Sequence, residues 1–403
     1  MSLQIDLHSI DKSNWKTFRF DQLAKSISER VDPSETDLDR YVGLEHLDPE
    51  TVHLYRYGSP ADVKGQKLKC YEGDVIFGKR RAYQRKAVVV DFDGICSAHA
   101  FVLRANPEVI LPSLFPFFLH SDAFMHRAVD ISVGGLSPTI NWKNLREQEF
   151  LLPPKDQQAA LAELLWAMDA VVEGERKILK QLERTLETTI EKEIHGVQLG
   201  GNTIQVVLNE VAKNQQLTTL NNLGELLKGR GIPKSEVVDS GTPCVRYGEL
   251  YTKHHRIIRK FHSFIDEPSK VRARRLMKND VLFAGSGETI SEIGKSAVFV
   301  NDFEAYVGSD TIVFRPKEMD GYFLGYLLNS QLVRQQLNKF GTGATVIHIY
   351  VSDLEKIQVP VIPKEKQVRI GQKLEVFATN IQKAEMQITS SQSLLRSLIN
   401  QIF

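Results

Sequence analysis

The chain has 403 residues, of which 42% are hydrophobic and 25% are charged, and its formal net charge is +1. This composition is ordinary for a soluble globular protein of two or three domains. A net charge near zero neither supports nor excludes nucleic acid as a partner, because the distribution of the charges decides that question.

Cysteine usage and hydropathy exclude several other classes. The three cysteines, Cys70, Cys96 and Cys244, are far apart and odd in number. They argue against a disulfide framework or a structural zinc site and fit a reducing compartment. No stretch approaches the roughly 18 consecutive apolar residues of a membrane span, and the polar N-terminus has no signal-peptide core. We therefore predict a cytoplasmic protein without membrane contact.

The residues before Asp156 predict a domain of mixed α and β structure with short elements. Residues 15–30 begin with alternating side chains and turn helical. Apolar, partly β-branched runs predict strands at 75–77, 87–90 and 100–103. Residues 114–129 are predicted to form a buried helix.

The segment 363–403 carries a long apolar repeat whose steps alternate between four and three residues, which is the pattern of a coiled-coil seam. Its positions are Ile370, Leu374, Phe377, Ile381, Ala384, Ile388, Ser391, Leu395, Leu398 and Ile402. The same register occurs earlier, at Leu161, Leu165, Met168, Val172, Glu175, Leu179, Leu182, Leu186, Thr189 and Glu193.

A seam of this kind requires a partner helix. Two helices of about 40 residues would each be roughly 60 Å long, and we predict that they pair with each other as an antiparallel coiled coil. The alternative is that each helix pairs with a second copy of the chain in a homodimer. The seam of the first helix carries polar residues at Glu175, Thr189 and Glu193, so its distal half is expected to pack loosely or to face a partner.

The first half of the chain recurs in the second half in the same order. Asn-Asp-Val-Leu-Phe at 279–283 matches Gly-Asp-Val-Ile-Phe at 73–77, and Pro-Lys-Glu-Lys-Gln at 363–367 matches Pro-Lys-Asp-Gln-Gln at 154–158. This is an internal duplication of a unit composed of a globular domain and a long helix. If the helices pack antiparallel, the molecule has two similar surfaces at a fixed separation, a geometry suited to duplex DNA.

The predicted fold class is therefore α+β, with two similar mixed α/β domains that are each followed by a long helix. The predicted boundaries are a first globular domain at 1–152, a first helix at 153–196, a linker at 197–202, a second globular domain at 203–361 and a second helix at 362–403.

The candidate catalytic motifs do not have the residue spacing that their chemistry requires. The P-loop glycine that Lys295 would require is replaced by Thr289. Neither a methyltransferase tetrapeptide nor a cofactor-binding glycine loop of the expected spacing occurs, and the histidines at 254, 255 and 262 lack the spacing of a helical metal site. The sequence predicts a non-catalytic protein with no cofactor and no metal.

Clustered cations are the more informative signal. Five Lys and Arg residues occur between positions 79 and 86, directly after a predicted strand, in a predicted loop or hairpin tip. Arginine reads guanine bidentately, glutamine reads adenine, and further cations neutralise phosphates. The DNA-binding candidates of this loop are Lys79, Arg80, Arg81, Tyr83, Gln84, Arg85 and Lys86.

A second excess of cations lies between 228 and 278. Its candidates are Lys228, Arg230, Lys234, Arg246, Tyr247, Lys253, Arg256, Arg272, Arg274 and Arg275. The counterpart of the first basic loop is 285–291, where Ser286 is a candidate and Glu288 is the only charge. Equal positions with different chemistry are expected of two domains that read different base sequences. For any single residue, a solvated surface charge remains the alternative.

The chain resembles a specificity subunit of a type I restriction-modification enzyme. The resemblance rests on the repeated Asp-Val-Ile/Leu-Phe strand, the glycine loops before Leu145 and Leu354, the Leu-Pro-Pro-Lys-Asp-Gln-Gln and Val-Ile-Pro-Lys-Glu-Lys-Gln helix entries, and the paired helices. It implies two target recognition domains, each reading one half of a split DNA sequence. The helices would fix the gap and dock two methyltransferase subunits, and restriction and translocase subunits would join the full complex.

Two other functions stay open from the residues alone. A scaffold or homodimeric adaptor would use the helices to bind only proteins. A stand-alone nuclease or methyltransferase is disfavoured by the absent motifs.

Overall fold

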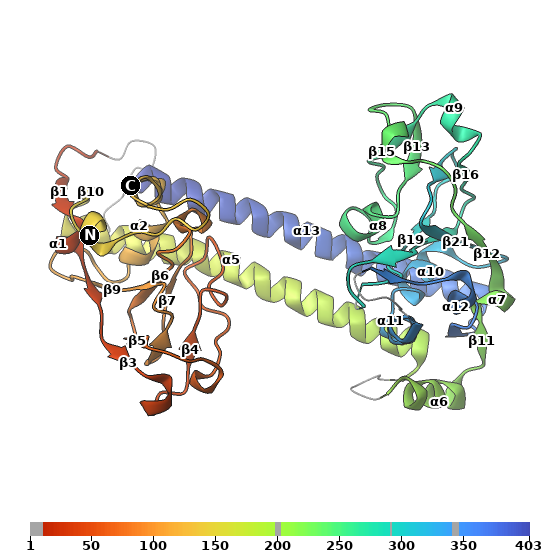
Figure 1. Cartoon of the computed structure of the whole chain (residues 1–403), viewed down its shortest axis with the longest axis horizontal. Coiled ribbons are helices and arrows are strands. Elements are labelled where there is room, and N and C mark those ends of the chain that lie inside the picture. The colour runs from red at the N-terminus through yellow and green to blue at the C-terminus, as the bar shows by residue number, and fades with distance from the viewer. Residues whose placement is uncertain (1–10, 198–202, 291, 341–345) are drawn as a thin grey trace. The chain divides into compact units, whose positions relative to one another are not determined.

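The computed structural model describes residues 11–197, 203–290, 292–340 and 346–403. The chain forms two compact units. Unit 1 comprises Met1–Arg176 and Met386–Phe403, and unit 2 comprises Lys177–Glu385. Each unit holds a mixed α/β domain and one segment of each long helix (Figure 1). The units divide both helices, so they differ from domain boundaries drawn in chain order.

Unit 1 contains two small sheets and one ribbon, packed with short helices. One sheet has the order β2-β9-β6-β7 and the other β3-β5-β8-β4, while β1 pairs with β10. The strands are β1 (Lys16–Arg19), β2 (Ala24–Ile27), β3 (Arg30–Val31), β4 (Tyr41–Val42), β5 (Lys67–Cys70), β6 (Val75–Phe77), β7 (Ala87–Val89), β8 (Gly94–Cys96), β9 (Phe101–Ala105) and β10 (Glu149–Leu152). The helices are α1 (Phe20–Leu23), α2 (Phe115–His120), α3 (Asp122–Asp130) and α4 (Trp142–Leu145), with 3-10 turns at Pro33–Glu35, Pro60–Asp62 and Ala82–Gln84.

Unit 2 repeats this plan. Its sheets have the orders β12-β21-β17-β19-β14 and β15-β13-β20-β16, and β11–β23 and β18–β22 form ribbons. The strands are β11 (Leu217–Thr219), β12 (Gly224–Lys228), β13 (Thr242–Val245), β14 (Arg256–Ile257), β15 (Ser263–Ile265), β16 (Arg274–Arg275), β17 (Asp280–Ala284), β18 (Ser286–Gly287), β19 (Ser296–Phe299), β20 (Tyr306–Val307), β21 (Thr311–Pro316), β22 (Ile347–His348) and β23 (Gln358–Pro360). The helices are α6 (Ile204–Asn214), α7 (Leu220–Leu223), α8 (Glu249–Thr252), α9 (Glu267–Lys270), α10 (Gly321–Leu327), α11 (Gln331–Phe340) and α12 (Val351–Leu354), with a 3-10 turn at Lys234–Glu236.

The internal duplication extends to buried polar contacts. Asp74 at the start of β6 is almost fully buried and accepts two hydrogen bonds from Arg104, at 2.7 and 2.9 Å. Asp280 at the start of β17 does the same with Arg315, at 2.9 and 2.7 Å. A buried carboxylate needs such a partner, so the shared Asp of the two sequence repeats is explained by one conserved contact in both units.

Two predicted elements differ from the structure. Residues 15–30 form strands on either side of a single helical turn, α1, because Lys16–Arg19 pair in register with β10. The helix predicted at 114–129 is broken at Ser121. There the Ser121 hydroxyl donates to the Phe118 carbonyl at 2.7 Å and accepts from the Phe124 amide at 3.2 Å, so it caps the start of α3.

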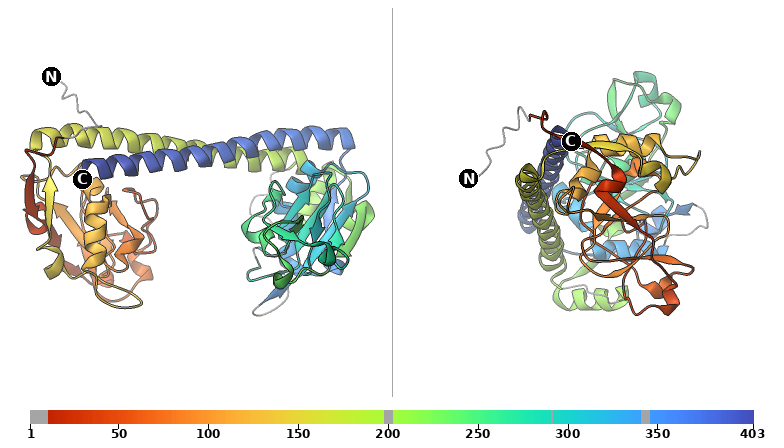
Figure 2. Two further views of the ribbon diagram at one scale, coloured as in Figure 1. Left: turned by 90° about the horizontal axis from the view of Figure 1, so that it is seen from above. Right: turned by 90° about the vertical axis from the view of Figure 1, so that its left-hand side faces the viewer.

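The two long helices are α5 (Lys155–Ile190), which continues as one π-helical turn (Glu191–His195), and α13 (Lys364–Ile402). In unit 1 the segments run antiparallel, because Leu161 shares a core with Ile402 while Glu175 meets Ser391. The two helical segments run along one side of the α/β domain of the unit (Figure 2). Every predicted seam residue is buried or half-buried.

The polar seam positions Glu175, Ser391 and Glu193 have partners in the neighbouring helix, whereas the Thr189 hydroxyl donates to the Thr185 carbonyl of its own helix. The Ser391 hydroxyl donates to the Glu175 carboxylate at 3.0 Å in unit 1. In unit 2, Lys373 and Glu193 form an ion pair at 2.7 Å. Two of the interruptions noted in the sequence are therefore matched contacts between the helices. Among the residues that the structure describes, none of the helices combines the length and apolar character needed to cross a membrane.

Candidate nucleic-acid interface

The basic loop 79–86 connects β6 to β7 and is fastened to a second loop. Arg80 and Thr139 form a β-bridge. The Arg81 amide donates to the Pro138 carbonyl at 2.7 Å, and the Ile140 amide donates to the Lys79 carbonyl at 2.9 Å. These backbone contacts hold the basic loop against the segment that follows Gly134 and Gly135, so two predicted loops form one surface.

The side chains of the basic loop fall into two groups. Arg80, Arg81 and Tyr83 are exposed, and Arg81 donates a hydrogen bond to the Ser137 hydroxyl at 3.1 Å. Lys79 lies over the Phe101 ring, and burial lowers its pKa. Lys86 donates to the Leu44 carbonyl at 2.9 Å, and Gln84 is half-buried.

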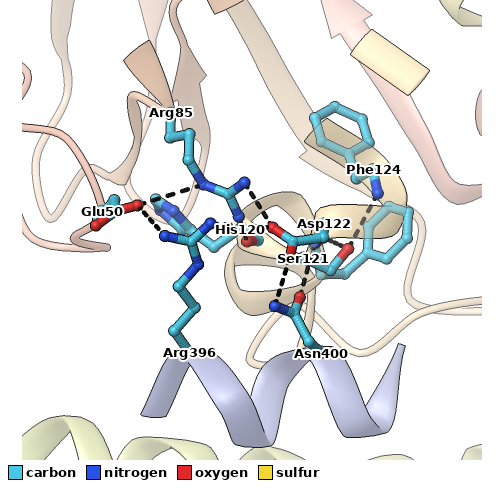
Figure 3. A network of polar contacts seen from close by, with 9 residues as sticks. Glu50, Arg85, His120, Ser121, Asp122, Phe124, Arg396 and Asn400 are labelled. Carbon is cyan, nitrogen blue, oxygen red and sulfur yellow. Dashed lines mark hydrogen bonds and ion pairs between the residues drawn. The ribbon is translucent and has the colours of Figure 1, made fainter. Parts of the chain in front are cut away.

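Arg85 belongs to an internal ion-pair network (Figure 3). Its side chain is 13% exposed, lies 2.7 Å from Asp122 and 3.7 Å from Glu50, and also bonds to the His120 carbonyl. From α13, Arg396 contacts Glu50 at 2.9 Å, and Asn400 and Asp122 exchange two hydrogen bonds. The Arg85 guanidinium is therefore engaged in contacts within unit 1.

The same network lowers the pKa of the Asp122 carboxylate. Partial burial would raise the pKa of Asp122, but hydrogen bonding and charge from Arg85, and then from Arg396, outweigh it, so the pKa lies below its ordinary value. The carboxylate therefore stays ionised and joins α13 to the α2–α3 region of unit 1.

The basic residues of unit 2 are only partly brought together. Lys228 at the end of β12, Arg230 and Arg274 of β16 form one cluster, in which Arg274 donates to the Lys228 carbonyl at 2.5 Å. Burial lowers the pKa of Arg274, and the positive charges of Arg230 and Arg315 lower it further. Positive charges therefore lie close together here, and such a cluster favours the binding of an anion. Arg275 is the next residue of β16 and is exposed.

Other candidates of unit 2 lie elsewhere. Arg256 is 13% exposed in its side chain, forms an ion pair with Glu187 of α5 at 2.9 Å and stacks over Tyr326. With Lys253 it lines a groove beside the two helical segments. Arg272 pairs with Glu236 at 2.5 Å. The rest are surface side chains: Lys234 and Tyr247 are exposed and Arg246 is half-buried.

The second unit also has a pair of joined loops. Ser286 of β18 pairs with His348 of β22, and the Ser286 hydroxyl lies 3.1 Å from Nδ1 of His348. The His348 and Tyr350 rings stack, with centroids 6.4 Å apart, and Tyr350 is 54% exposed. Sequence reasoning named Ser286 but missed His348 and Tyr350. The sequence carried one usable signal, because apolar and polar residues alternate at 347–350. With Ile347 and Ile349 buried, His348 and Tyr350 lie on the other side of the strand.

Within the described part of the chain, no group of three or more His, Cys, Asp or Glu side chains is placed to hold a metal ion. Of the predicted loop 285–291, Ser291 lies outside the described residues, as do residues 341–343 of the glycine-rich run.

The fold and these surfaces define a duplicated α+β protein whose two units each present paired loops beside long helices. A family described as the type I restriction modification DNA specificity domain matches residues 12–184 and again 213–390. The chain therefore belongs to this family, as the resemblance in the sequence predicted.

Individual relatives are distant. The EcoDI specificity subunit of Escherichia coli is 28% identical over 148 residues, which cover 36% of this chain and 33% of that protein. A putative MjaX specificity subunit of Methanocaldococcus jannaschii is 20% identical over 88% of this chain and 85% of its own length. The chain thus spans a third of the first relative and most of the second.

Solved structures share the fold. A chain from a study of the assembly and conformational transition of a type I R-M system superposes with a TM-score of 0.57 at 20% identity, covering 97% of this chain and 96% of that one. An S subunit from M. genitalium superposes with a TM-score of 0.56 at 14% identity, covering 98% of both chains.

Proposed function

We propose that the chain is the non-catalytic, DNA-reading subunit of a type I restriction-modification complex. Each unit reads one half of a bipartite target. α5 and α13 fix the gap between the halves and dock two methyltransferase subunits, and restriction and translocase subunits join the larger assembly. The chain needs no cofactor of its own and works in the cytoplasm, where the DNA is.

One observation carries this proposal. The DNA specificity family matches the chain twice, at 12–184 and 213–390, so each match covers one mixed α/β domain and most of the long helix that follows it. Two copies of a domain from a DNA specificity family are what a reader of two half-sites requires.

The proposed interface is limited to side chains that form no ion pair within the described residues, although Arg81 and Arg274 each donate one hydrogen bond. In unit 1 these are Arg80, Arg81 and Tyr83, and in unit 2 they are the cluster of Lys228, Arg230, Arg274 and Arg275. Arginine supplies bidentate contacts to guanine or phosphate, and lysine supplies charge. Exposed arginines next to an exposed tyrosine also suit a surface that combines hydrogen bonding with stacking.

The test is a map of methylated positions in cells that express the chain together with its methyltransferase subunit. The proposal predicts one bipartite motif with a fixed gap, absent when the chain is omitted. The assembled complex should also lose affinity for that duplex steeply as salt rises. Methylation that does not depend on the chain, or a complex without preference for any duplex, would support the adaptor function instead.

A further inference from the structure

We propose that the two β-bridged residue pairs, Arg80–Thr139 in unit 1 and Ser286–His348 in unit 2, are the positions that set the base preference of each unit. This inference rests on the proposed function and deepens it, because it names the side chains through which each half-site is distinguished. Two of the four residues, Thr139 and His348, were not among the DNA-binding candidates of the sequence.

The two pairs occupy the same place in the two backbones. In unit 1 the Ile140 amide donates to the Lys79 carbonyl at 2.9 Å, and the bridge between Arg80 and Thr139 comes one residue further. In unit 2 the Ile349 amide donates to the Gly285 carbonyl at 3.0 Å, and Ser286 is bridged to His348. The same contact pattern occurs after the same repeated strand, β6 or β17.

The backbone at this place is fixed from the inside. Ile140 and Ile349 are 1% and 3% exposed, so both second strands of the bridge are anchored in a core. Because successive residues of a strand point to opposite sides, burial of Ile347 and Ile349 directs His348 and Tyr350 outward. A rigid support with outward side chains suits recognition better than a mobile loop does.

Further contacts immobilise the pair in unit 2. The Tyr251 hydroxyl donates to the Ser286 carbonyl at 2.7 Å. Any Cβ at Gly287 would lie 2.7 Å from that same hydroxyl oxygen, so a larger residue at 287 would displace the Tyr251 side chain. The Ser286 hydroxyl then holds Nδ1 of His348 at 3.1 Å, which fixes the ring and leaves Nε2 as its second polar atom.

The side chains on this common backbone differ completely. Arg80 is exposed and carries a guanidinium, whose two parallel donors match O6 and N7 of guanine. Ser286 and His348 together offer one imidazole nitrogen, with the exposed Tyr350 ring stacked beside it. One backbone with exchangeable polar groups is the arrangement expected when two copies of a domain recognise different bases.

The experiment exchanges the pairs in the full chain, assembled with methyltransferase subunits. The double variant Ser286→Arg/His348→Thr places the unit 1 side chains on the unit 2 backbone. We expect the base preference of one half-site to change, with methylation of the original half falling by about tenfold or more, since one good side chain–base pair accounts for discrimination of that order. The other half-site and the gap should stay as they are.

Matched variants separate recognition from folding. His262→Ala removes an exposed histidine of unit 2 outside the pair and should leave the motif unchanged. Thr139→Ala, in unit 1, should affect only the half-site that unit 1 reads. An unchanged motif from a double variant that still melts at the wild-type temperature would overturn this inference while leaving the proposed function intact. The absence of any bipartite motif in the wild type would instead overturn the proposed function itself.

Discussion

At the residue scale, two arginines of one loop have opposite environments. Arg80 is exposed, and its side chain forms no hydrogen bond or ion pair with the described residues, whereas Arg85 is 13% exposed and joins Asp122 and Glu50. An arginine that is bound internally cannot also be offered to a base without breaking those contacts. Under the proposed function, the loop therefore combines a residue for recognition, Arg80, with a residue for structure, Arg85.

This difference gives a matched test. Arg80→Met should relax one half-site and leave thermal stability within experimental scatter, because exposed substitutions change it little. Arg85→Met should keep the base preference but lower stability by about 1–3 kcal/mol, because Asp122 loses a charged partner. Thermal melting and methylation mapping of both variants measure this. The reverse pattern would show that the two roles are assigned to the wrong arginines.

A hydrogen bond between a histidine and a carboxylate joins the α/β domain of unit 1 to helix α5. His53 lies 2.6 Å from Asp169 of α5, whose side chain is 9% exposed, and this hydrogen bond raises the pKa of His53 against the effect of burial. A raised pKa means that the protonated form is favoured in the folded state. Its contribution to stability is full below the ordinary histidine value of about 6.5 and is lost as pH rises through the folded-state pKa.

We therefore expect His53→Gln to be less stable than the wild type at pH 6 and closer to it at pH 9. Melting temperatures of both proteins across this range give the difference directly. A difference that stays constant, or that grows toward alkaline pH, would contradict the assignment.

The limits of sequence reasoning are clearest for single residues. Asp74 and Asp280 belong to a repeated pattern, so their equivalence could be predicted. The role of Arg85 could not, because it depends on Asp122, which is 37 residues away, and on the α13 side chains that meet the same carboxylate. His348 was missed for a similar reason, since its exposure follows from pairing with Ser286, 62 residues away.

At the element scale, the long helices were the most predictable part of the fold. Their heptad spacing is a local property of the sequence, and it predicts a long helix in each of the two places where α5 and α13 lie. The polar interruptions of the seam could also be located in the sequence. Only the structure shows that two of them, Glu175 and Ser391, are hydrogen-bonded to each other across the helices.

The helix ends dock on the two units with opposite charges. In unit 1, Arg396 of α13 meets Glu50 and Asp122. At the corresponding heptad position of α5, Glu187 meets Arg256 in unit 2. If a second copy of α5 took the place of α13 on unit 1, a carboxylate would face two carboxylates. This charge pattern favours pairing between the two helices of one chain over pairing between identical helices.

Glycines in the two helices allow a second matched test. A Cβ at Gly371 of α13 would lie 2.8 Å from Oδ1 of Asp320 and 2.9 Å from the Phe323 amide, at the capped start of α10. At Gly174 of α5 a Cβ would meet nothing within 4 Å. Gly371→Ala should destabilise by about 1–3 kcal/mol through overpacking, and Gly174→Ala should stabilise by about 0.5–1 kcal/mol.

Chemical denaturation of the two variants measures both effects with the same added methyl group. Equal changes would mean that α13 does not pack against α10 as closely as described. Retained base preference in both variants would show that the changes act on stability alone.

At the scale of the whole molecule, duplication accounts for most of what the sequence could predict. The order of the repeated segments gave two similar α/β domains, and the strand orders β2-β9-β6-β7 and β12-β21-β17-β19 confirm them. The paired loops escaped prediction because each is made from segments distant in the chain, and a basic run alone does not reveal which cations are already bound.

The central claim is that two units read two half-sites and that the helices set the distance between them. Its most direct test removes one heptad from each helix, residues 177–183 of α5 and 379–385 of α13, and maps methylation again. Seven residues correspond to about 10 Å of helix, or about three base pairs of duplex at about 3.4 Å each. We predict that both half-sites keep their sequences while the gap shortens by about that amount. An unchanged gap in a folded, active complex, or a change in the half-site sequences themselves, would contradict the account.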